Sequence, residues 1–171
     1  MSAADARAIT DRPVYLLGFG EVSNYYHGSR ARPDITVTGF AQAAPEAFRM
    51  AGVRHADIDC FEPYDDYPMV VLMQLEDLGF CEKGKGGRFV ADGNLISGTG
   101  KLPFNTDGGG LCSNHPGNRG GLTKVLEAVR QLRGEAHPKV QVKNCDLAVA
   151  HGTGGSLGLR HGSATVILER E

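Results

Sequence analysis

The chain has 171 residues, of which 41% are hydrophobic and 22% charged, and its formal net charge is −2. This length fits a single domain over residues 1–171 with room for a buried core. The near-neutral charge gives no reason to expect a nucleic acid or an anionic membrane as partner, and no apolar run approaches the length of a membrane span.

Cysteine and glycine usage indicates a reducing compartment and a loop-lined site. The four cysteines lie far apart without a Cys-x-x-Cys pair, which argues against a zinc site and a disulfide framework. Residues 1–12 form a polar, alanine-rich lead-in that does not look like a signal peptide, so we expect a cytoplasmic protein. The glycines cluster between Gly79 and Gly162 without a repeat period, which is typical of tight loops around a site.

Strand and helix patterns alternate along the chain. The predicted strands are residues 13–18, 58–61, 88–90, 102–105, 146–150 and 163–168. The predicted helices are residues 41–51, 68–78 and 122–133, and residues 21–38 are expected to form a long surface loop. This order predicts an α/β fold with a mostly parallel sheet, one antiparallel strand and helices on both faces.

Three details of these helices can be tested against the structure. Pro45 is expected in the first turn of its helix, because proline is tolerated there. Asp65 and Asp66 are expected to cap the free amides of the helix that Pro68 opens. The helix before Gly134 has the clearest amphipathic pattern, with apolar residues at helical spacing: Leu122, Val125, Leu126, Val129 and Leu132.

The chemistry is expected in loops that follow strands. The glycine-rich stretch Asn105–Gly121 carries His115 to the start of an amphipathic helix, either as an acid–base group or as an incidental residue of a flexible turn. His151 heads a second glycine loop, and Tyr64 and Asp66 lie in a turn between a strand and a helix. Since ligands of α/β sheets bind beyond the carboxyl ends of strands, these loops could converge on one site.

Acyl transfer fits these groups better than metal binding or phosphate binding. No two potential metal ligands stand at helical i, i+4 spacing, and neither glycine-rich phosphate motif is present. Acyl transfer needs a base and donors for an oxyanion, which imidazoles and glycine-loop amides can supply. The nucleophile is not obvious: Cys112 can equally be packed beneath the loop, and Ser113 and Ser156 have no better case.

Several motifs, in the right order, resemble the C-terminal half of the thiolase superfamily, with the sterol-carrier-protein thiolases and thiolase-like lipid-transfer proteins as the nearest branch. Residues 105–117 resemble the family's Gly-His-Pro loop, and residues 128–136 the end of the following helix. Residues 151–155 (His-Gly-Thr-Gly-Gly) resemble the late His-Asn-x-Gly loop, and residues 75–81 the helix after the middle turn. The resemblance runs from about Ala6 to the end.

This resemblance implies a βαβαβαββ half of a two-half subunit and a coenzyme A thioester as substrate, with no other cofactor and no metal. His115 would activate a cysteine carried by the N-terminal half and donate to the thioester oxygen. Tyr64 falls where the family has the Asn or His of the middle turn. His151 would also belong to the site, and the oxyanion-binding groups would be Gly110, Asn114, Gly154 and Gly155.

Two departures from the family leave the reaction open. Asp66 stands where the sterol-carrier branch has a proton-exchanging cysteine, and the half that carries the nucleophile is not in these residues. The first hypothesis is a thiolase-type acyltransferase that needs an N-terminal half or partner subunit and forms an oligomer. The second is a retro-aldolase acting on β-hydroxyacyl thioesters without a cysteine. The third is a non-catalytic lipid- or acyl-carrier-binding or assembly subunit.

Overall fold

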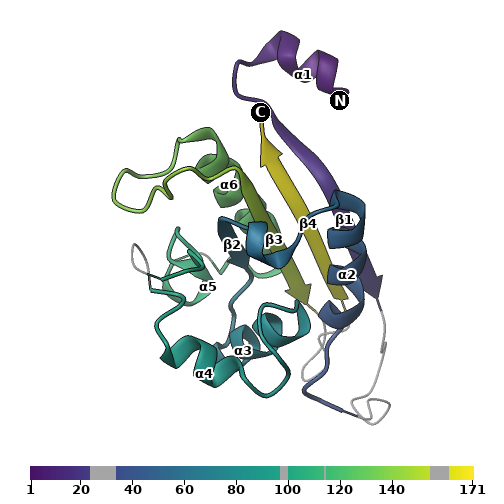
Figure 1. Ribbon diagram of the computed structural model, residues 1–171, viewed down its shortest axis with the longest axis vertical. Helices are drawn as coiled ribbons and strands as arrows, with labels where there is room; N and C mark the ends of the chain where they lie inside the picture. The colour runs from purple at the N-terminus through teal and green to yellow at the C-terminus, as the bar shows by residue number, and fades with distance from the viewer. Residues whose placement is uncertain (24–33, 97–99, 114, 155–161) are drawn as a thin grey trace.

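A computed structural model describes the chain except residues 24–33, 97–99, 114 and 155–161 (Figure 1). The α-helices are α1 (Ala3–Ile9), α2 (Phe40–Ala51), α3 (Pro68–Asp77), α4 (Gly86–Ala91), α5 (Gly109–Cys112) and α6 (Gly120–Arg133). The strands are β1 (Val14–Ser23), β2 (Cys60–Pro63), β3 (Leu147–Gly154) and β4 (Gly162–Arg170). Two 3-10 turns, η2 (His55–Asp57) and η3 (Gly117–Arg119), complete the described elements. No helix in the described ranges is long and apolar enough to cross a membrane.

The strands form one sheet in the order β1-β4-β3-β2. β2 and β3 are parallel, whereas β4 runs antiparallel to both of its neighbours. The strand predicted at residues 102–105 is reduced to a single parallel bridge between Phe61 and Phe104 at the β2 edge. The prediction of a mixed α/β sheet with one antiparallel strand is confirmed.

Helices cover both faces of this sheet, as predicted. α2 packs on β1 and β4 on one face, called the α2 face below, and α6 packs on the opposite α6 face (Figure 1). Strand alternation separates the two faces: on β3, Val149 points to the α2 face, and Ala148 and Ala150 point to the α6 face.

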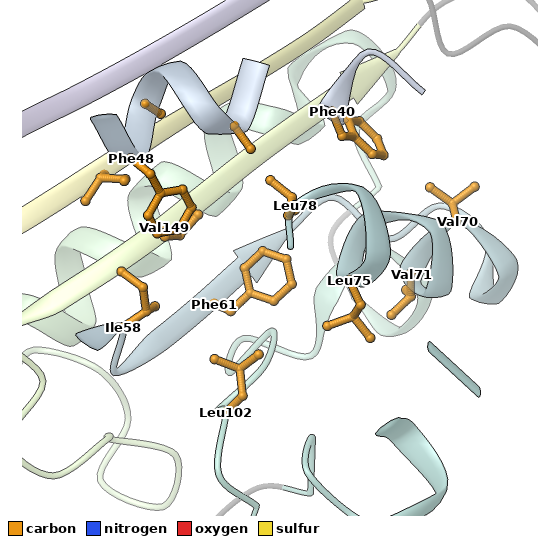
Figure 2. Close-up of a cluster of buried hydrophobic side chains, with 13 residues drawn as sticks. Phe40, Phe48, Ile58, Phe61, Val70, Val71, Leu75, Leu78, Leu102 and Val149 are labelled. Carbon is orange, nitrogen blue, oxygen red and sulfur yellow. The ribbon is translucent and has the colours of Figure 1, made fainter. Parts of the chain in front are cut away.

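The α2 face holds the larger hydrophobic cluster, with phenylalanines from α2 and β2 packed against leucines from α3 and its C-terminus (Figure 2). Phe40, Phe61 and Leu75 are fully buried there. The cluster on the α6 face is built from smaller side chains, including Ala128, Ala148 and Ala150. Burial of apolar area therefore stabilises the α2 face most strongly.

α2 begins more than one turn before Pro45, so the proline lies inside the helix and not in its first turn as predicted. The amides of Ala41, Gln42 and Ala43 donate to carbonyls of Thr38 and Gly39, which closes the first turn. This turn buries Phe40 completely. Burial of that ring offsets the hydrogen bond that proline cannot donate.

Two strands are longer than predicted. β1 continues through Ser23, so the loop expected over residues 21–38 begins as a strand paired with β4, and its residues 24–33 lie outside the described part. β3 continues through Gly154 and contains His151, which therefore lies in a strand and not at the head of a loop. Pairing with the antiparallel β4 explains both extensions, since each strand gains ladder hydrogen bonds.

Two local predictions are wrong. Residues 88–90 form part of helix α4 and not a strand; α4 packs beside α3, and the Gly86 amide donates to Glu76 Oε1 at 2.9 Å. α3 starts at Pro68 as predicted, and its N-cap residue, Tyr67, makes no side-chain cap. Asp65 binds amides of α5 instead, as described below.

α6 ends at Gly134 in the left-handed conformation, as predicted, but its buried side differs from the predicted apolar stripe. Leu122 and Leu126 are 60% and 52% exposed. The buried residues are Gly120, Lys124, Glu127, Ala128, Gln131 and Leu132. The polar stripe of Lys124, Glu127 and Gln131 lies against the loop at residues 106–107 and the segment at residues 140–142, whereas Ala128 and Leu132 pack on the sheet.

Candidate functional site

Tyr64 and His115 meet at the carboxyl end of β2. The Tyr64 amide donates to the His151 carbonyl at 2.8 Å, which extends the β2–β3 ladder by one residue and fixes the start of the turn. Tyr64 Oη is hydrogen-bonded to His115 Nδ1 at 2.7 Å, and the two rings are nearly parallel, with centroids 5.6 Å apart. Tyr64 is 5% exposed, whereas His115 lies at the surface.

Gly120 makes room for the Tyr64 ring. A Cβ atom at position 120 would lie 2.0 Å from Tyr64 Cε2, far inside van der Waals contact. Gly120 is the first residue of α6, so the phenol packs directly on the backbone of the helix start. The position of Tyr64 therefore depends on glycine at this place.

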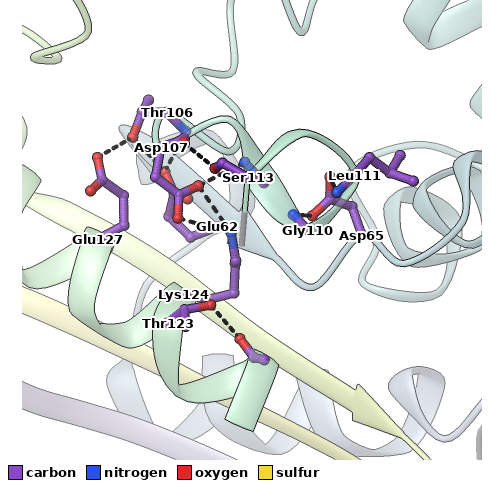
Figure 3. A network of polar contacts seen from close by, with 12 residues as sticks. Glu62, Asp65, Thr106, Asp107, Gly110, Leu111, Ser113, Thr123, Lys124 and Glu127 are labelled. Carbon is purple, nitrogen blue, oxygen red and sulfur yellow. Dashed lines mark hydrogen bonds and ion pairs between the residues drawn. The ribbon is translucent and has the colours of Figure 1, made fainter. Parts of the chain in front are cut away.

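Asp65 fastens the glycine-rich loop to the turn after β2. Its Oδ1 accepts from the Gly110 amide at 2.5 Å, and its Oδ2 lies 3.5 Å from the Leu111 amide (Figure 3). Gly109 has a left-handed φ of 68°, and a Cβ there would lie 2.2 Å from Asp65 Oδ2. Glycine is needed at position 109 for both reasons.

A buried ion pair fastens the same loop to α6. Lys124 Nζ lies 3.0 Å and 3.2 Å from the two carboxylate oxygens of Asp107, and the lysine side chain is fully buried (Figure 3). Asp107 also accepts from the Gly109 amide at 2.8 Å. The loop that carries His115 is thus held at its start from two directions, by α6 and by the β2 turn.

Below Tyr64 on the same strand, Glu62 is fully buried in a polar network. Its Oε1 accepts from the Thr106 amide at 3.1 Å and from the Cys60 thiol at 3.2 Å, and lies 2.8 Å from the Thr106 hydroxyl. Burial raises the pKa of Glu62 to about 7. The Thr106 hydroxyl also contacts Glu127 of α6 at 2.7 Å.

His151 lies on the other face of the sheet from Tyr64 and His115. Its imidazole packs against the ring of Phe40 on the α2 face, and its Nδ1 is 2.6 Å from Thr165 Oγ1. The side chain is fully buried, and burial lowers its pKa to about 3. The imidazole is therefore neutral at physiological pH, and its backbone carbonyl is the part that reaches Tyr64.

The remaining predicted site residues are placed as follows. Asp66 is half-buried in the turn beside Tyr64, and Gly154 is exposed at the end of β3. The Gly110 amide is engaged by Asp65, and its oxyanion role stays a prediction. Asn114 and Gly155 lie outside the described residues. Within the described residues, no cluster of three His, Cys, Asp or Glu side chains could hold a metal ion.

Sequence reasoning missed the polar groups beneath the site. They are Glu62, Thr106, Lys124, Glu127 and Gln131. A signal was available on α6, where Lys124, Glu127 and Gln131 follow one another at i, i+3 and i+7 and so share one helical face. Next to an apolar stripe such a face is usually solvated, and only its contacts with residues 106–107 and 140–142 show that it is buried.

Comparison with known proteins finds thiolases and aldolases. The family model "Thiolase C-terminal domain-like" matches residues 20–170. The chain is 38% identical over 154 residues to an acetyl-CoA acetyltransferase of Methanothermobacter thermautotrophicus, and 34% identical over 138 residues to a steroid side-chain-cleaving aldolase of Thermomonospora curvata. These matches cover 90% and 78% of the chain.

The fold matches solved structures of the same group. A structure described as Ltp2-ChsH2(DUF35) aldolase superposes with a TM-score of 0.83 at 32% identity, covering 99% of this chain and 42% of that one. The chain spans 39% of the acetyltransferase and 34% of the steroid-cleaving aldolase. With the family model matching most of its length, the chain belongs to the thiolase family, as a C-terminal domain of the thiolase-like fold.

Proposed function

We propose that this chain is the acid–base half of an enzyme that breaks or forms a carbon–carbon bond beside the carbonyl of an acyl-coenzyme A thioester, in a retro-aldol reaction. The observation that carries the proposal is the 2.7 Å hydrogen bond between Tyr64 Oη and His115 Nδ1. It joins the two side chains that the thiolase resemblance assigns to the site.

A phenol hydrogen-bonded to an imidazole can move the proton that a retro-aldol step requires. With Tyr64 donating to Nδ1, the neutral ring of His115 carries its own proton on Nε2. The phenol oxygen accepts the proton of the substrate β-hydroxyl while its own proton passes to Nδ1. The β-carbon then becomes a carbonyl, the Cα–Cβ bond breaks, and the electron pair moves to the thioester oxygen as an enolate.

The same imidazole can stabilise that enolate. Once Nδ1 holds the proton, the ring is an imidazolium whose Nε2–H is available to donate to the enolate oxygen. The enolate carbon then takes the extra proton of the imidazolium, which returns the ring to its neutral form and releases an acyl thioester, so the reaction balances without a cysteine. Steroid side-chain cleavage by an aldolase relative supports this chemistry.

The second candidate is acyl transfer with a cysteine nucleophile from another half. It is favoured by the similarity to the acetyltransferase and by the exposed position of His115. In this reaction His115 would activate the cysteine and donate to the thioester oxygen. Tyr64 would then act only by holding the imidazole.

An N-terminal thiolase-like half is the proposed partner. On the α6 face, Leu122 and Leu126 of α6 are exposed, and so are Leu16 and Phe19 of β1. Leu16 and Phe19 pair across the sheet with Leu168 and Val166, whose side chains pack in the α6-face cluster. The two exposed side chains of β1 therefore lie on the same side of the molecule as the two exposed leucines of α6. A surface of this kind is typical of a permanent interface.

The test is turnover by the chain co-expressed with the adjacent N-terminal half. β-Hydroxyacyl-coenzyme A should be cleaved to a carbonyl compound and a shorter thioester, whereas β-ketoacyl-coenzyme A with free coenzyme A should not react. Tyr64→Phe and His115→Ala should each lower kcat by about 10²–10⁴-fold. Tyr67→Phe and His137→Ala, which alter an exposed tyrosine and an exposed histidine, are the matched controls.

Full turnover by Tyr64→Phe would overturn the retro-aldol proposal. Thiolysis of the β-ketoacyl substrate that survives in Tyr64→Phe but not in His115→Ala would select acyl transfer instead.

A further inference from the structure

The Thr106 hydroxyl lies between two buried carboxyl groups. Its Oγ1 is 2.8 Å from Glu62 Oε1 and 2.7 Å from Glu127 Oε1, and the two glutamates are 0% and 4% exposed (Figure 3). A hydroxyl has one hydrogen to donate, so it can serve only one of two ionised carboxylates. The other contact is a hydrogen bond only if that carboxyl supplies a proton.

Gln131 cannot resolve this conflict, because its amide is a donor here. Gln131 Oε1 accepts from the Val142 amide at 2.8 Å, which fixes the orientation of the side chain. Gln131 Nε2 therefore donates, to Thr106 Oγ1 at 2.8 Å and to Glu127 Oε1 at 2.9 Å. These bonds fill one acceptor site on Thr106 and supply no second hydrogen between the carboxyls.

We propose that Glu62 and Glu127 hold one proton between them through Thr106, and that this proton makes Glu62 a positioning residue for the Tyr64–His115 pair. The role of the pair in catalysis rests on the proposed function, whereas the shared proton does not. Glu62 is two residues before Tyr64 on the same face of β2, and Thr106 is the start of the loop that carries His115.

The surrounding charges assign the proton to Glu62. Glu127 accepts from Gln131, lies 3.7 Å from Arg130, and borders a cavity of about 400 Å³ that Arg130, His137, Asp107 and Glu135 also line, so it has a cation and open space beside it. Glu62 faces the thiol of Cys60, and Cys145 lies beside that thiol. The negative charge of Asp107 repels an ionised Glu62. Lys124 does not relieve this repulsion fully, because it is paired with Asp107.

No cation contacts Glu62 in the described part of the chain, and its Oε2 has no hydrogen-bond partner there. An ionised carboxylate in such a place is costly, and a neutral acid is not. The rise of the Glu62 pKa by burial, to about 7, agrees with this assignment.

Loss of the proton should release the loop from β2. Glu62 binds both the backbone amide and the hydroxyl group of Thr106. The neighbouring Asn105 has a left-handed φ of 42°, and its amide donates to the Phe61 carbonyl. With both carboxyls ionised, Thr106 can bind one of them, and the two charges repel across a single oxygen. The loop start then moves, and the His115–Tyr64 hydrogen bond lengthens.

The test is a pH titration followed by NMR on the chain with carbon-13-labelled glutamate carboxyls, in complex with any half that co-purifies. One glutamate should titrate near neutral pH, and Glu62→Gln should remove that signal. Resonances of the His115 ring and the Thr106 amide should shift with the same midpoint in the unmodified chain. In Glu62→Gln the Thr106 amide should stay constant over that range, and the change with the Glu62 midpoint should be absent from the His115 ring.

Glu127→Gln provides a second route if Glu62→Gln does not fold. The Thr106 hydroxyl can then donate wholly to Glu62, so the Glu62 midpoint should fall by about one pH unit or more. Glu135→Gln, which changes an exposed glutamate at the rim of the same cavity, should leave the midpoint where it is.

Ordinary acidic midpoints for all glutamates would overturn the shared proton. A neutral midpoint without a matching shift of His115 and Thr106 would overturn the positioning role. Neither NMR readout depends on turnover. A fully active Tyr64→Phe variant would overturn the retro-aldol proposal and would leave the shared proton untouched.

Discussion

The two faces of the sheet differ in what fills them. The α2 face is filled by large apolar side chains such as Phe40, Phe61 and Leu75, whereas the α6 face buries Glu62, Lys124 and Gln131. The apolar face stabilises the fold through buried area, which tolerates small shifts of shape. The polar face stabilises one arrangement of a loop, because buried polar groups must keep their partners. The Tyr64–His115 pair stands on the polar face.

Leu75→Ala should have the largest effect, because it leaves a cavity in the apolar face without touching the site. We expect a loss of about 2–5 kcal/mol in the free energy of unfolding, measured by denaturant titration. Leu16→Ala, at an exposed leucine, is the matched control. A loss below about 1 kcal/mol would show that this face is not the main source of stability.

Lys124→Met tests the polar face by removing one partner of a buried ion pair. Asp107 would be left almost buried without its cation, and we expect a loss of about 3 kcal/mol. Lys124→Met combined with Asp107→Asn should recover part of this loss. Lys83→Met, which breaks a half-exposed pair with Asp77, should cost clearly less. Equal losses for the two lysines would contradict the comparison.

The two faces should also respond to pH in opposite directions. His151 on the α2 face has a pKa lowered to about 3, so the folded state binds its proton less well than the unfolded state. Stability from His151 is complete above about pH 6.5 and is lost as pH falls towards 3, by about 3 kcal/mol at pH 4.5. Glu62, with a raised pKa, contributes stability that is lost as pH rises from about 4.5 through 7.

Because these trends offset each other, the His151 effect is best measured in the Glu62→Gln background. There, unfolding free energy should fall steadily from pH 6.5 to 4.5, and a further His151→Asn change should flatten the curve. His137→Asn serves as the exposed control. A slope that survives His151→Asn would assign the acid sensitivity to other groups.

Leu126→Ser should have the smallest effect on the chain itself, within about 0.5 kcal/mol, because the side chain is largely exposed. It should nevertheless weaken co-purification with the proposed N-terminal half, since that half would cover the apolar part of the α6 face. Thr36→Val, remote from this surface, is the control. Unchanged co-purification would place the partner elsewhere.

The sequence was sufficient for the order of the four strands and of the helices α2, α3 and α6, and for the sharp ends of helices. Gly134 ends α6 and Pro68 begins α3 as predicted, because the backbone chemistry of glycine and proline acts locally. Pro45 shows the limit: its place inside α2 depends on the burial of Phe40, which is a tertiary effect. Residues 88–90 became helical for a similar reason, through packing of α4 beside α3.

The residues of the candidate site could be proposed from the sequence, but their geometry could not. The thiolase resemblance pointed to Tyr64 and His115 separately, and the bond between them joins positions 51 residues apart. Asp65 was expected to cap the next helix and instead binds amides 45 residues away. The face of Lys124, Glu127 and Gln131 is polar by sequence, and only its contacts with residues 106–107 and 140–142 make it interior.

The edge position of β1 has a consequence for handling the protein. Within the described residues no strand pairs with the outer side of its ten residues, and Leu16 and Phe19 of the same strand are exposed. Such an edge is a template for strand addition by another molecule. A chain purified without whatever covers this side should self-associate as its concentration rises, and a lysine in place of Leu16 should keep it monodisperse for longer.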